Sequence, residues 1–402
     1  MSTDALRRSI LISAASGAAL LPGLARAADK PLKVGAALPL TGPLAPEGAR
    51  QRNGYQIWAD TVNAAGGIKA GGDSYRIEMV YVDYQSNTPR AVQSAERLIT
   101  EDKVHFLFAP FGSGAVKAVS AVTEKYGVPM LAPNAASVQV YDQGFKYLFG
   151  VYTPNRTLTE PIADLVRSRH PDIRRLAILA RNDLFPTAMA DDMQAAARSR
   201  GFEIVYSEKY AVGSVDFGAA LTKLRGAQPD WVYFVGYTND LILARRQMSE
   251  QGVSGKLLTM VVGAADRNFI KAVGRQADGV TTISYWDVAA GYKSKDVFGS
   301  AENFAKMYEA KYGEPPEYSG AASAACGVVL QMAIEKVGSL DRARVRDAIA
   351  AMDTMTFYGP VRFGPTGQIN SLKPPLLQVQ GDKPVVIFPP EYKTGELRLG
   401  FR

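Results

Sequence analysis

The residues best suited to binding chemistry form two short polar loops, each placed directly after a strand-like apolar segment. Ser113 follows one segment and opens a helix-like stretch, and Asn134-Ala135-Ala136-Ser137 follows another. Backbone N–H groups in the first turn of a helix have no partner within that helix, and the helix dipole favours an anion there. Both loops could therefore hold a carboxylate. Ser113 could equally serve as a helix N-cap, and the residues taken alone favour that simpler role.

Side chains that usually carry catalysis or bind metals are scarce in this sequence. Cys326 is the single cysteine, His105 and His170 are the two histidines, and these three residues lie far apart. They form neither a zinc-ligand pattern nor a nucleophile–base pair. The glycine-flanked Ser113 matches neither a nucleophile elbow nor a phosphate-binding loop. We therefore expect a binding protein without a metal or cofactor. An enzyme is the alternative, which turnover of a bound ligand would reveal.

Length and composition indicate a large globular protein. The chain has 402 residues, of which 47% are hydrophobic and 21% are charged, enough for a sizeable core in two or three domains. The 46 basic residues exceed the 39 acidic ones by a formal charge of +7, with no basic run. This thin excess argues against nucleic-acid binding.

Residues 1–27 have the pattern of an export signal. Arg7 and Arg8 give a basic start, residues 9–21 form a stretch of apolar and small residues, and an A-x-A cleavage pattern ends at Ala27. The apolar stretch is shorter than the ~20 residues that a membrane span requires. We expect cleavage near Ala27, by either the twin-arginine or the ordinary secretory route, and no later membrane span.

Strand-like and helix-like segments alternate along the rest of the chain and must position these loops. Such alternation implies parallel, doubly wound sheets, in which ligands lie outside the carboxyl ends of the strands. The expected strands are 33–38, 75–81, 106–109, 130–132, 175–180, 203–210, 231–235, 257–262 and 280–284. The expected helices include 48–63, 89–101, 113–126, 187–200, 217–226 and 240–251.

Several short motifs follow one another in a specific order along residues 33–389. They are KVGAALPLTGP at 33–43, NAAGGI at 63–68, VDYQ at 82–85, FGSG at 111–114, YGVP at 126–129, QPD at 228–230, YGPVRF at 358–363 and QVQG at 378–381. In this order they resemble the solute-binding proteins of ABC importers of the leucine/isoleucine/valine-binding type. The resemblance implies a type I periplasmic binding protein fold, with two doubly wound α/β lobes joined by a three-crossover hinge.

The resemblance also implies lobe limits. Lobe 1 would contain residues 28–151 and 286–357, and lobe 2 would contain residues 152–285 and 358–402. The crossings would fall near 150–153, 284–287 and 357–364. Several crossings near one plane make a hinge about which the lobes close on a ligand.

In similar proteins the residue that matches Ser113 contacts the ligand carboxylate. Ala136 stands where branched-chain amino-acid binders have a threonine, so either Ser137 substitutes for that hydroxyl or the loop uses its backbone amides. On the other lobe, Phe185 and Tyr237 stand where aromatic residues face the ligand.

The ammonium group of an amino acid would need a carboxylate partner. Asp266 follows the strand at which similar amino-acid binders place an acid, although it could instead cap the next helix. Glu47 and Asp240 are the reserves, and Glu47 replaces an aromatic residue that is frequent in relatives. Tyr285 and Trp286, at the second crossing, are further candidates for ligand contact.

The resemblance implies a periplasmic receptor, expected to be a monomer, that delivers a small carboxylate-bearing ligand to ABC permease subunits in the inner membrane. A branched-chain or other amino acid is the expected ligand. An aromatic carboxylate or a small amide is the alternative, and a ligand-sensing module is a different role for the same architecture.

Overall fold

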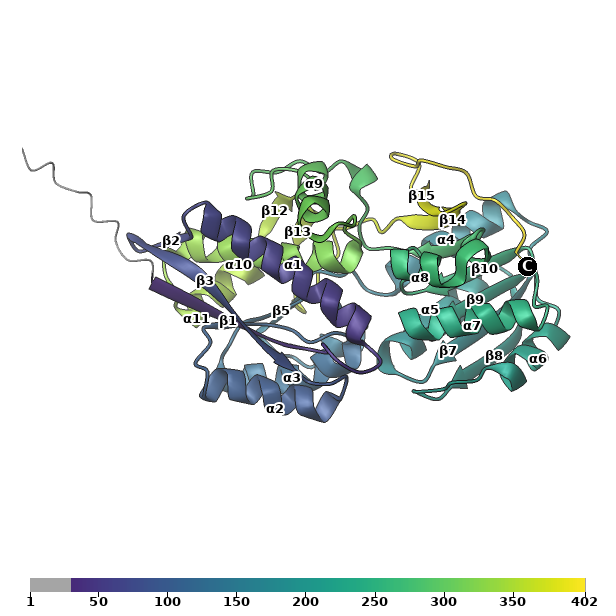
Figure 1. The fold of residues 1–402 in the computed structure, drawn as a ribbon, viewed down its shortest axis with the longest axis horizontal. Helices are drawn as coiled ribbons and strands as arrows, with labels where there is room; N and C mark the ends of the chain where they lie inside the picture. Colours follow the sequence, from purple (N-terminus) through teal and green to yellow (C-terminus); the bar gives the residue numbers. More distant parts are fainter. Residues whose placement is uncertain (1–29, 402) are drawn as a thin grey trace, which may run out of the picture.

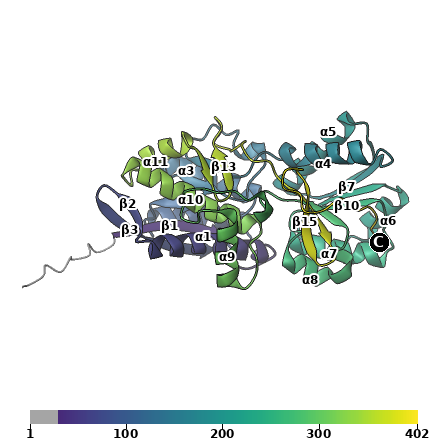
Figure 2. The same cartoon turned by 90° about the horizontal axis from the view of Figure 1, so that it is seen from above.

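Two α/β lobes lie side by side along the longest axis of the molecule, as Figures 1 and 2 show from two directions. The structure, a computed structural model, describes residues 30–401. The export signal and the cleavage site near Ala27 lie outside the described residues and stay a prediction.

The first lobe is built on a six-stranded sheet. Its strands, in spatial order, are β2 (Ile68–Ala70), β3 (Asp73–Asp83), β1 (Lys30–Leu38), β4 (Phe106–Phe108), β5 (Met130–Ala132) and β6 (Leu148–Gly150). β2 is antiparallel to β3, and the other neighbours are parallel. Its helices are α1 (Ala45–Ala64), α2 (Thr88–Thr100), α3 (Ser113–Tyr126), α9 (Ala301–Tyr312), α10 (Tyr318–Val337) and α11 (Arg342–Ala350), with a short 3-10 helix at Val138–Val140.

The second lobe is built on a seven-stranded sheet. Its strands, in spatial order, are β15 (Lys383–Phe388), β14 (Leu376–Gln380), β11 (Val280–Ile283), β10 (Leu257–Val261), β9 (Trp231–Val235), β7 (Arg175–Arg181) and β8 (Glu203–Tyr210). β14 is antiparallel to both of its neighbours, β11 and β15, and the other neighbours are parallel. Its helices are α4 (Arg156–Arg169), α5 (Leu184–Ser199), α6 (Gly218–Gly226), α7 (Thr238–Glu250) and α8 (Arg267–Val273), followed by a 3-10 helix at Gly274–Ala277.

Both sheets agree with the predicted doubly wound α/β class, which is confirmed. All nine expected strands are present, and three of them, β5, β8 and β9, have the expected bounds. β4, β5 and β9 are buried throughout, as strands covered on both faces must be. Continuous apolar runs between glycine and proline punctuation therefore marked these strands well.

The third connection between the lobes is predicted near residues 357–364, and two contacts favour a later position for it. The hairpin of β12 (Asp353–Thr356) and β13 (Gly359–Arg362) lies in the first lobe, where Gly150 of β6 bridges Gln368. Ser284, just after β11, donates its backbone N–H to the Pro375 carbonyl at 2.9 Å. We therefore propose a third crossing at residues 370–375, and the other lobe limits stay predictions. A 3-10 helix at Val288–Ala290 follows the second crossing.

Within residues 30–401, one helix is long and apolar enough, by length and composition, to cross a membrane, contrary to the sequence-based expectation. This helix, α10, packs against α1, α11, β2 and β5. Fourteen of its 20 residues are buried. A core helix is apolar all round for the same reason that a membrane span is, so composition alone does not separate the two.

Small residues let α10 approach α1 closely. A methyl group on Gly327 of α10 would overlap the indole of Trp58, a fully buried residue of α1. We expect Gly327→Ala to lower the free energy of unfolding by about 1–3 kcal/mol, because overpacking forces this contact to open. Urea unfolding measures the change.

The matched control is Gly226→Ala at the end of α6, where an added methyl group meets nothing within 4 Å. We expect that variant to change stability by less than about 1 kcal/mol. Equal effects of the two substitutions would contradict the close-packing argument.

Candidate functional site

A pocket of about 290 Å³ lies between the lobes, and its walls are mostly aromatic. Both lobes and the segments that join them contribute to it, so its shape depends on how the lobes are placed. The ten lining residues are Phe111, Gly112, Asn134, Ala136, Tyr152, Phe185, Tyr237, Val262, Tyr285 and Tyr318.

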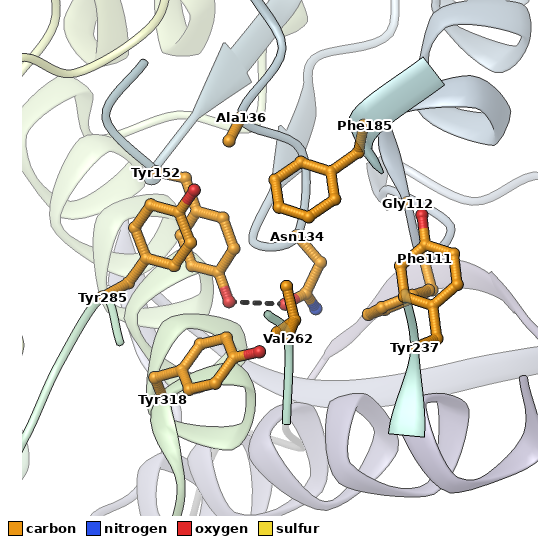
Figure 3. A pocket seen from close by; sticks show the side chains of 10 residues that line it. All are labelled: Phe111, Gly112, Asn134, Ala136, Tyr152, Phe185, Tyr237, Val262, Tyr285 and Tyr318. Atoms are coloured by element: carbon orange, nitrogen blue, oxygen red, sulfur yellow. Dashed lines mark hydrogen bonds between the residues drawn. The ribbon is translucent and has the colours of Figure 1, made fainter. Parts of the chain in front are cut away.

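Five of the six aromatic rings form two groups on opposite sides of the pocket, and Phe185 lies between them in the view of Figure 3. Tyr152 and Tyr285 stack at 3.6 Å between ring centroids, and Tyr318 lies tilted beside them. On the other side, Phe111 meets Tyr237 edge to face at 5.4 Å. Flat rigid walls of this kind suit a ring or a compact apolar body.

The two predicted anion loops lie next to each other. Gly112 donates its backbone N–H to the Asn134 carbonyl at 3.2 Å, and Ser137 donates its backbone N–H to Ser113 Oγ at 3.3 Å. Parallel β4 and β5 are neighbours, so the loops after their carboxyl ends meet at one edge of the sheet.

Ser113 is the first residue of α3, and the N-cap is Gly112, with a φ of 87° that favours glycine. The Ser113 side chain makes no capping bond and instead holds the neighbouring loop. Ser113 is fully buried beside Gly112, which lines the pocket.

Unpaired polar atoms gather near these loops. Tyr152 donates its hydroxyl to Asn134 Oδ1 at 2.6 Å, which leaves Asn134 Nδ2 buried without a hydrogen-bond partner among residues 30–401. Ser137 Oγ is likewise buried without a hydrogen-bond partner among these residues. Buried donors usually find acceptors, so these atoms mark a place for an acceptor-bearing ligand group.

The pocket tyrosines stay neutral. Burial raises the pKa of Tyr237, Tyr285 and Tyr318 well above the usual value for tyrosine, because the phenolate would be desolvated. Their hydroxyls therefore remain hydrogen-bond donors across the physiological pH range. Tyr285 OH has no partner among the described residues.

Asp266 lies outside the pocket lining and has other partners. One of its oxygens accepts the Asn268 backbone N–H at 2.6 Å at the start of α8, and the other accepts from Arg50 at 2.9 Å. Asp266 therefore caps a helix and pairs with an arginine of the other lobe.

Two more acidic residues lie beside that ion pair, and we call the four residues the Arg50 cluster: Glu47, Arg50, Asp266 and Glu317. Arg50 is buried and also donates to Thr238 Oγ1 at 3.0 Å. Burial lowers the pKa of Arg50, but the charges of Asp266, Glu317 and Glu47 together raise that pKa by more than burial lowers it. The guanidinium therefore stays charged. Because Thr238 and Asp266 belong to the second lobe, the Arg50 cluster fastens the two lobes together.

Glu47 borders a second cavity, of about 210 Å³, which adjoins the aromatic pocket and shares four of its residues. Glu47 Oε1 accepts the Thr238 backbone N–H at 3.0 Å. Glu47 Oε2 is buried and has no hydrogen-bond partner within residues 30–401.

Of the other residues predicted to contact the ligand, five line the pocket and Ala135 does not. Asn134, Ala136, Phe185, Tyr237 and Tyr285 line the pocket. Ala135 lies buried within its loop, where its carbonyl accepts the Tyr141 hydroxyl at 2.8 Å.

Two candidates lie elsewhere, and we leave them out of the proposed site. Trp286 packs edge to face on Phe304 at 5.8 Å. Asp240 pairs with Arg181 at 3.0 Å.

Sequence reasoning did not select Phe111, Gly112, Tyr152, Val262 or Tyr318, although all five line the pocket. The first two belong to the FGSG motif, Tyr152 lies in a predicted crossing, and Val262 ends a predicted strand. These four positions could therefore have been selected from the sequence. No motif, crossing or predicted strand end marks Tyr318, which lies at the start of α10.

Among residues 30–401, no group of three or more His, Cys, Asp or Glu side chains is placed to hold a metal ion.

Comparisons with known proteins agree with this architecture. A family model described as periplasmic binding protein matches residues 31–383. The chain belongs to this family. It is similar to the Leu/Ile/Val-binding protein homolog 7 of Brucella suis biovar 1, with 27% identity across 96% of this chain and 98% of the relative.

Solved structures show the same fold. The branched-chain amino acid substrate-binding protein LivJ of Streptococcus pneumoniae, in complex with isoleucine, is 25% identical, with a TM-score of 0.80 over 90% of this chain and 100% of that one. A solute-binding protein of an R. palustris ABC transporter, in complex with benzoate, is 24% identical, with a TM-score of 0.75 over 89% of this chain and 95% of that one.

These likenesses confirm the type I periplasmic binding protein fold and the function class predicted from the sequence motifs. The protein is a periplasmic binding protein of the branched-chain amino acid ABC transporter type. The family and its structural neighbours are solute-binding receptors for ABC importers.

Glu317 makes the charge of the Arg50 cluster depend on pH. It accepts the backbone N–H groups of Ser319 and Gly320 at 3.0 and 2.9 Å, and its side chain keeps 21% of its surface exposed. Burial raises the pKa of Glu317 from 4.5 to about 7, against the opposing pull of Arg50. A raised carboxyl pKa stabilises the fold below pH 4.5, and this contribution is lost as the pH rises through 7.

We expect Glu317→Gln to abolish the loss of stability that ionisation of Glu317 causes as the pH rises. Between pH 5 and pH 8, the free energy of unfolding of the unsubstituted protein should fall relative to that of Glu317→Gln by about 1–3 kcal/mol. Urea unfolding at the two pH values measures the difference. Parallel pH profiles for the two proteins would contradict it.

Proposed function

We propose that the protein binds a small aromatic carboxylate between its lobes and delivers it to ABC permease subunits. The observation that carries this proposal is the pocket lining: six aromatic residues and no carboxylate. The carboxylate of the ligand would lie at the loops of Gly112, Asn134 and Ser137, where unpaired donors and the α3 N-terminus favour an anion.

The Arg50 cluster supports an aromatic carboxylate over an amino acid. A buried ammonium group without a partner costs several kcal/mol. Asp266, the acid predicted to hold that group, already accepts from Arg50 and from the Asn268 backbone. A simple carboxylate ligand needs no such acid.

An amino acid remains the second candidate, because Glu47 Oε2, in the adjoining cavity, has no hydrogen-bond partner in the part of the chain that the structure describes. The relatives with known ligands include one bound to isoleucine and one bound to benzoate. Both ligand classes are therefore accommodated by this fold.

Titration calorimetry of the full chain with benzoate, leucine, valine and phenylalanine tests the ligand class. We expect heat of binding from benzoate and none from leucine or valine. Binding of leucine or phenylalanine with no heat from benzoate would establish the amino-acid alternative. Recovery of the ligand unchanged after long incubation would support binding without turnover.

Ser113 provides a test of the carboxylate loops. We expect Ser113→Ala to weaken binding of the recognised carboxylate by about 0.5–3 kcal/mol, because the Ser137 loop loses the acceptor that positions it. Ser120→Ala is the matched control, since Ser120 is a buried serine of the same helix whose hydroxyl donates to the Lys117 carbonyl and accepts from the Gln143 amide, with no bond to residues 134–137. Equal affinities in the two variants, with both folded, would remove Ser113 from the site.

We also propose that the chain is exported and cleaved near Ala27, on the evidence of Arg7, Arg8 and the A-x-A pattern. Mass spectrometry of the protein from the periplasmic fraction should show a mature chain that begins near Ala28. An intact Met1 or Ser2 terminus in that fraction would contradict cleavage.

A further inference from the structure

We infer that Glu47 Oε2 accepts a hydrogen bond from a hydroxyl group at the far end of the ligand, so that the ligand is a ring-hydroxylated aromatic carboxylate. This inference rests on the proposed function and names the ligand class more narrowly. Glu47 then acts as the residue that selects hydroxylated over plain aromatic acids.

The two cavities share part of their lining and differ in the chemistry of the rest. Phe111, Tyr237, Val262 and Tyr318 line both cavities. The loops of Gly112 and Asn134 belong to the aromatic pocket, whereas Glu47, Arg50 and Ser319 belong to the adjoining cavity. A ring held between the shared side chains would have its carboxylate at the first end and a ring substituent at the second.

Glu47 has an unused acceptor at that second end. Its side chain is 5% exposed, and Oε1 is taken by the Thr238 backbone N–H at 3.0 Å. Oε2 has no donor among the described residues, and neither does Ser319 Oγ in the same cavity. A buried carboxylate oxygen left without a donor is costly, so a ligand donor placed there is favourable.

The surrounding charges favour a hydroxyl over an ammonium group. Arg50 lines the same cavity, with its guanidinium 3.5 Å from Glu47 Oε1, so a ligand cation would face a fixed cation. Carboxylate oxygens of Asp266 and Glu317 lie 2.9 and 3.6 Å from nitrogens of that guanidinium and offset its charge. A neutral hydroxyl donates to Oε2 without competing with Arg50.

The experiment compares benzoate, 4-hydroxybenzoate and 4-methoxybenzoate by titration calorimetry on the full chain. In the unsubstituted protein we expect 4-hydroxybenzoate to bind about 10- to 100-fold tighter than benzoate, the range for a hydrogen bond to a charged acceptor. The methoxy compound has no donor, so we expect it to bind no tighter than benzoate.

The test variant is Glu47→Gln, which keeps the shape of the side chain and an oxygen for the Thr238 N–H but turns an amide donor toward the ligand. We expect the preference for 4-hydroxybenzoate over benzoate to fall to within about threefold, and the binding of 4-methoxybenzoate to improve relative to benzoate.

The matched control is Asp266→Asn, which weakens the ion pair between the lobes and leaves the Glu47 side chain and its bond to the Thr238 backbone N–H in place. We expect it to weaken benzoate and 4-hydroxybenzoate by the same factor, so that their ratio stays at the unsubstituted value. Circular dichroism and thermal unfolding establish that each variant is folded.

The outcomes separate the two claims. Similar affinities for benzoate and 4-hydroxybenzoate in the unsubstituted protein overturn the role of Glu47 and leave the aromatic-carboxylate proposal standing. An unchanged ratio in Glu47→Gln also overturns that role. If none of the benzoates binds and leucine does, the proposed ligand class fails and this inference fails with it. If Glu47→Gln does not fold, the three-ligand comparison in the unsubstituted protein decides.

Discussion

The ion pair between Arg50 and Asp266 is the interaction on which the arrangement of the site depends. It joins α1 of the first lobe to the start of α8 in the second, with both side chains buried. Two further bonds run beside it, from the Thr238 backbone N–H to Glu47 and from the Asn239 amide to the Pro43 carbonyl. Burying charges is costly, so a pair of this kind contributes direction and register more than net stability. It fixes how the two halves of the pocket face each other.

That same pair decides which chemistry is left for the ligand. An acid placed after β10 can bind an ammonium group only if it is not already paired with another cation. Here Asp266 is paired with Arg50, and the lining of the aromatic pocket contains neutral donors and rings. Glu47 and Arg50 border the adjoining cavity, where Glu47 Oε2 has no hydrogen-bond partner among residues 30–401. Under the proposed function, ligand preference follows from a contact between the lobes as much as from the residues that touch the ligand.

Local patterns predicted much of this structure, and long-range packing explains the rest. β5, β8, β9 and α3 have the bounds expected from their apolar runs and flanking residues. The loops of Ser113 and Asn134 could be paired in advance because neighbouring parallel strands end at one edge. The partner of Asp266 could not, since Arg50 is 216 positions away and no local pattern links them. Tyr318 reaches the pocket only through the packing of α10 against α1, and Trp286 turns instead toward Phe304.

The stacked pair of Tyr152 and Tyr285 links ligand contact to the geometry of the hinge. Tyr152 lies between β6 and α4, and Tyr285 directly follows β11, so both belong to segments that connect the lobes. They stack at 3.6 Å and line one wall of the pocket. Phe111 on the first lobe and Tyr237 on the second form the opposite wall. A rotation of the lobes about these connecting segments would move Tyr237 away from Phe111 and leave the tyrosine pair near the axis. A ligand that bridged both walls would then favour the lobe arrangement in which Arg50 and Asp266 meet.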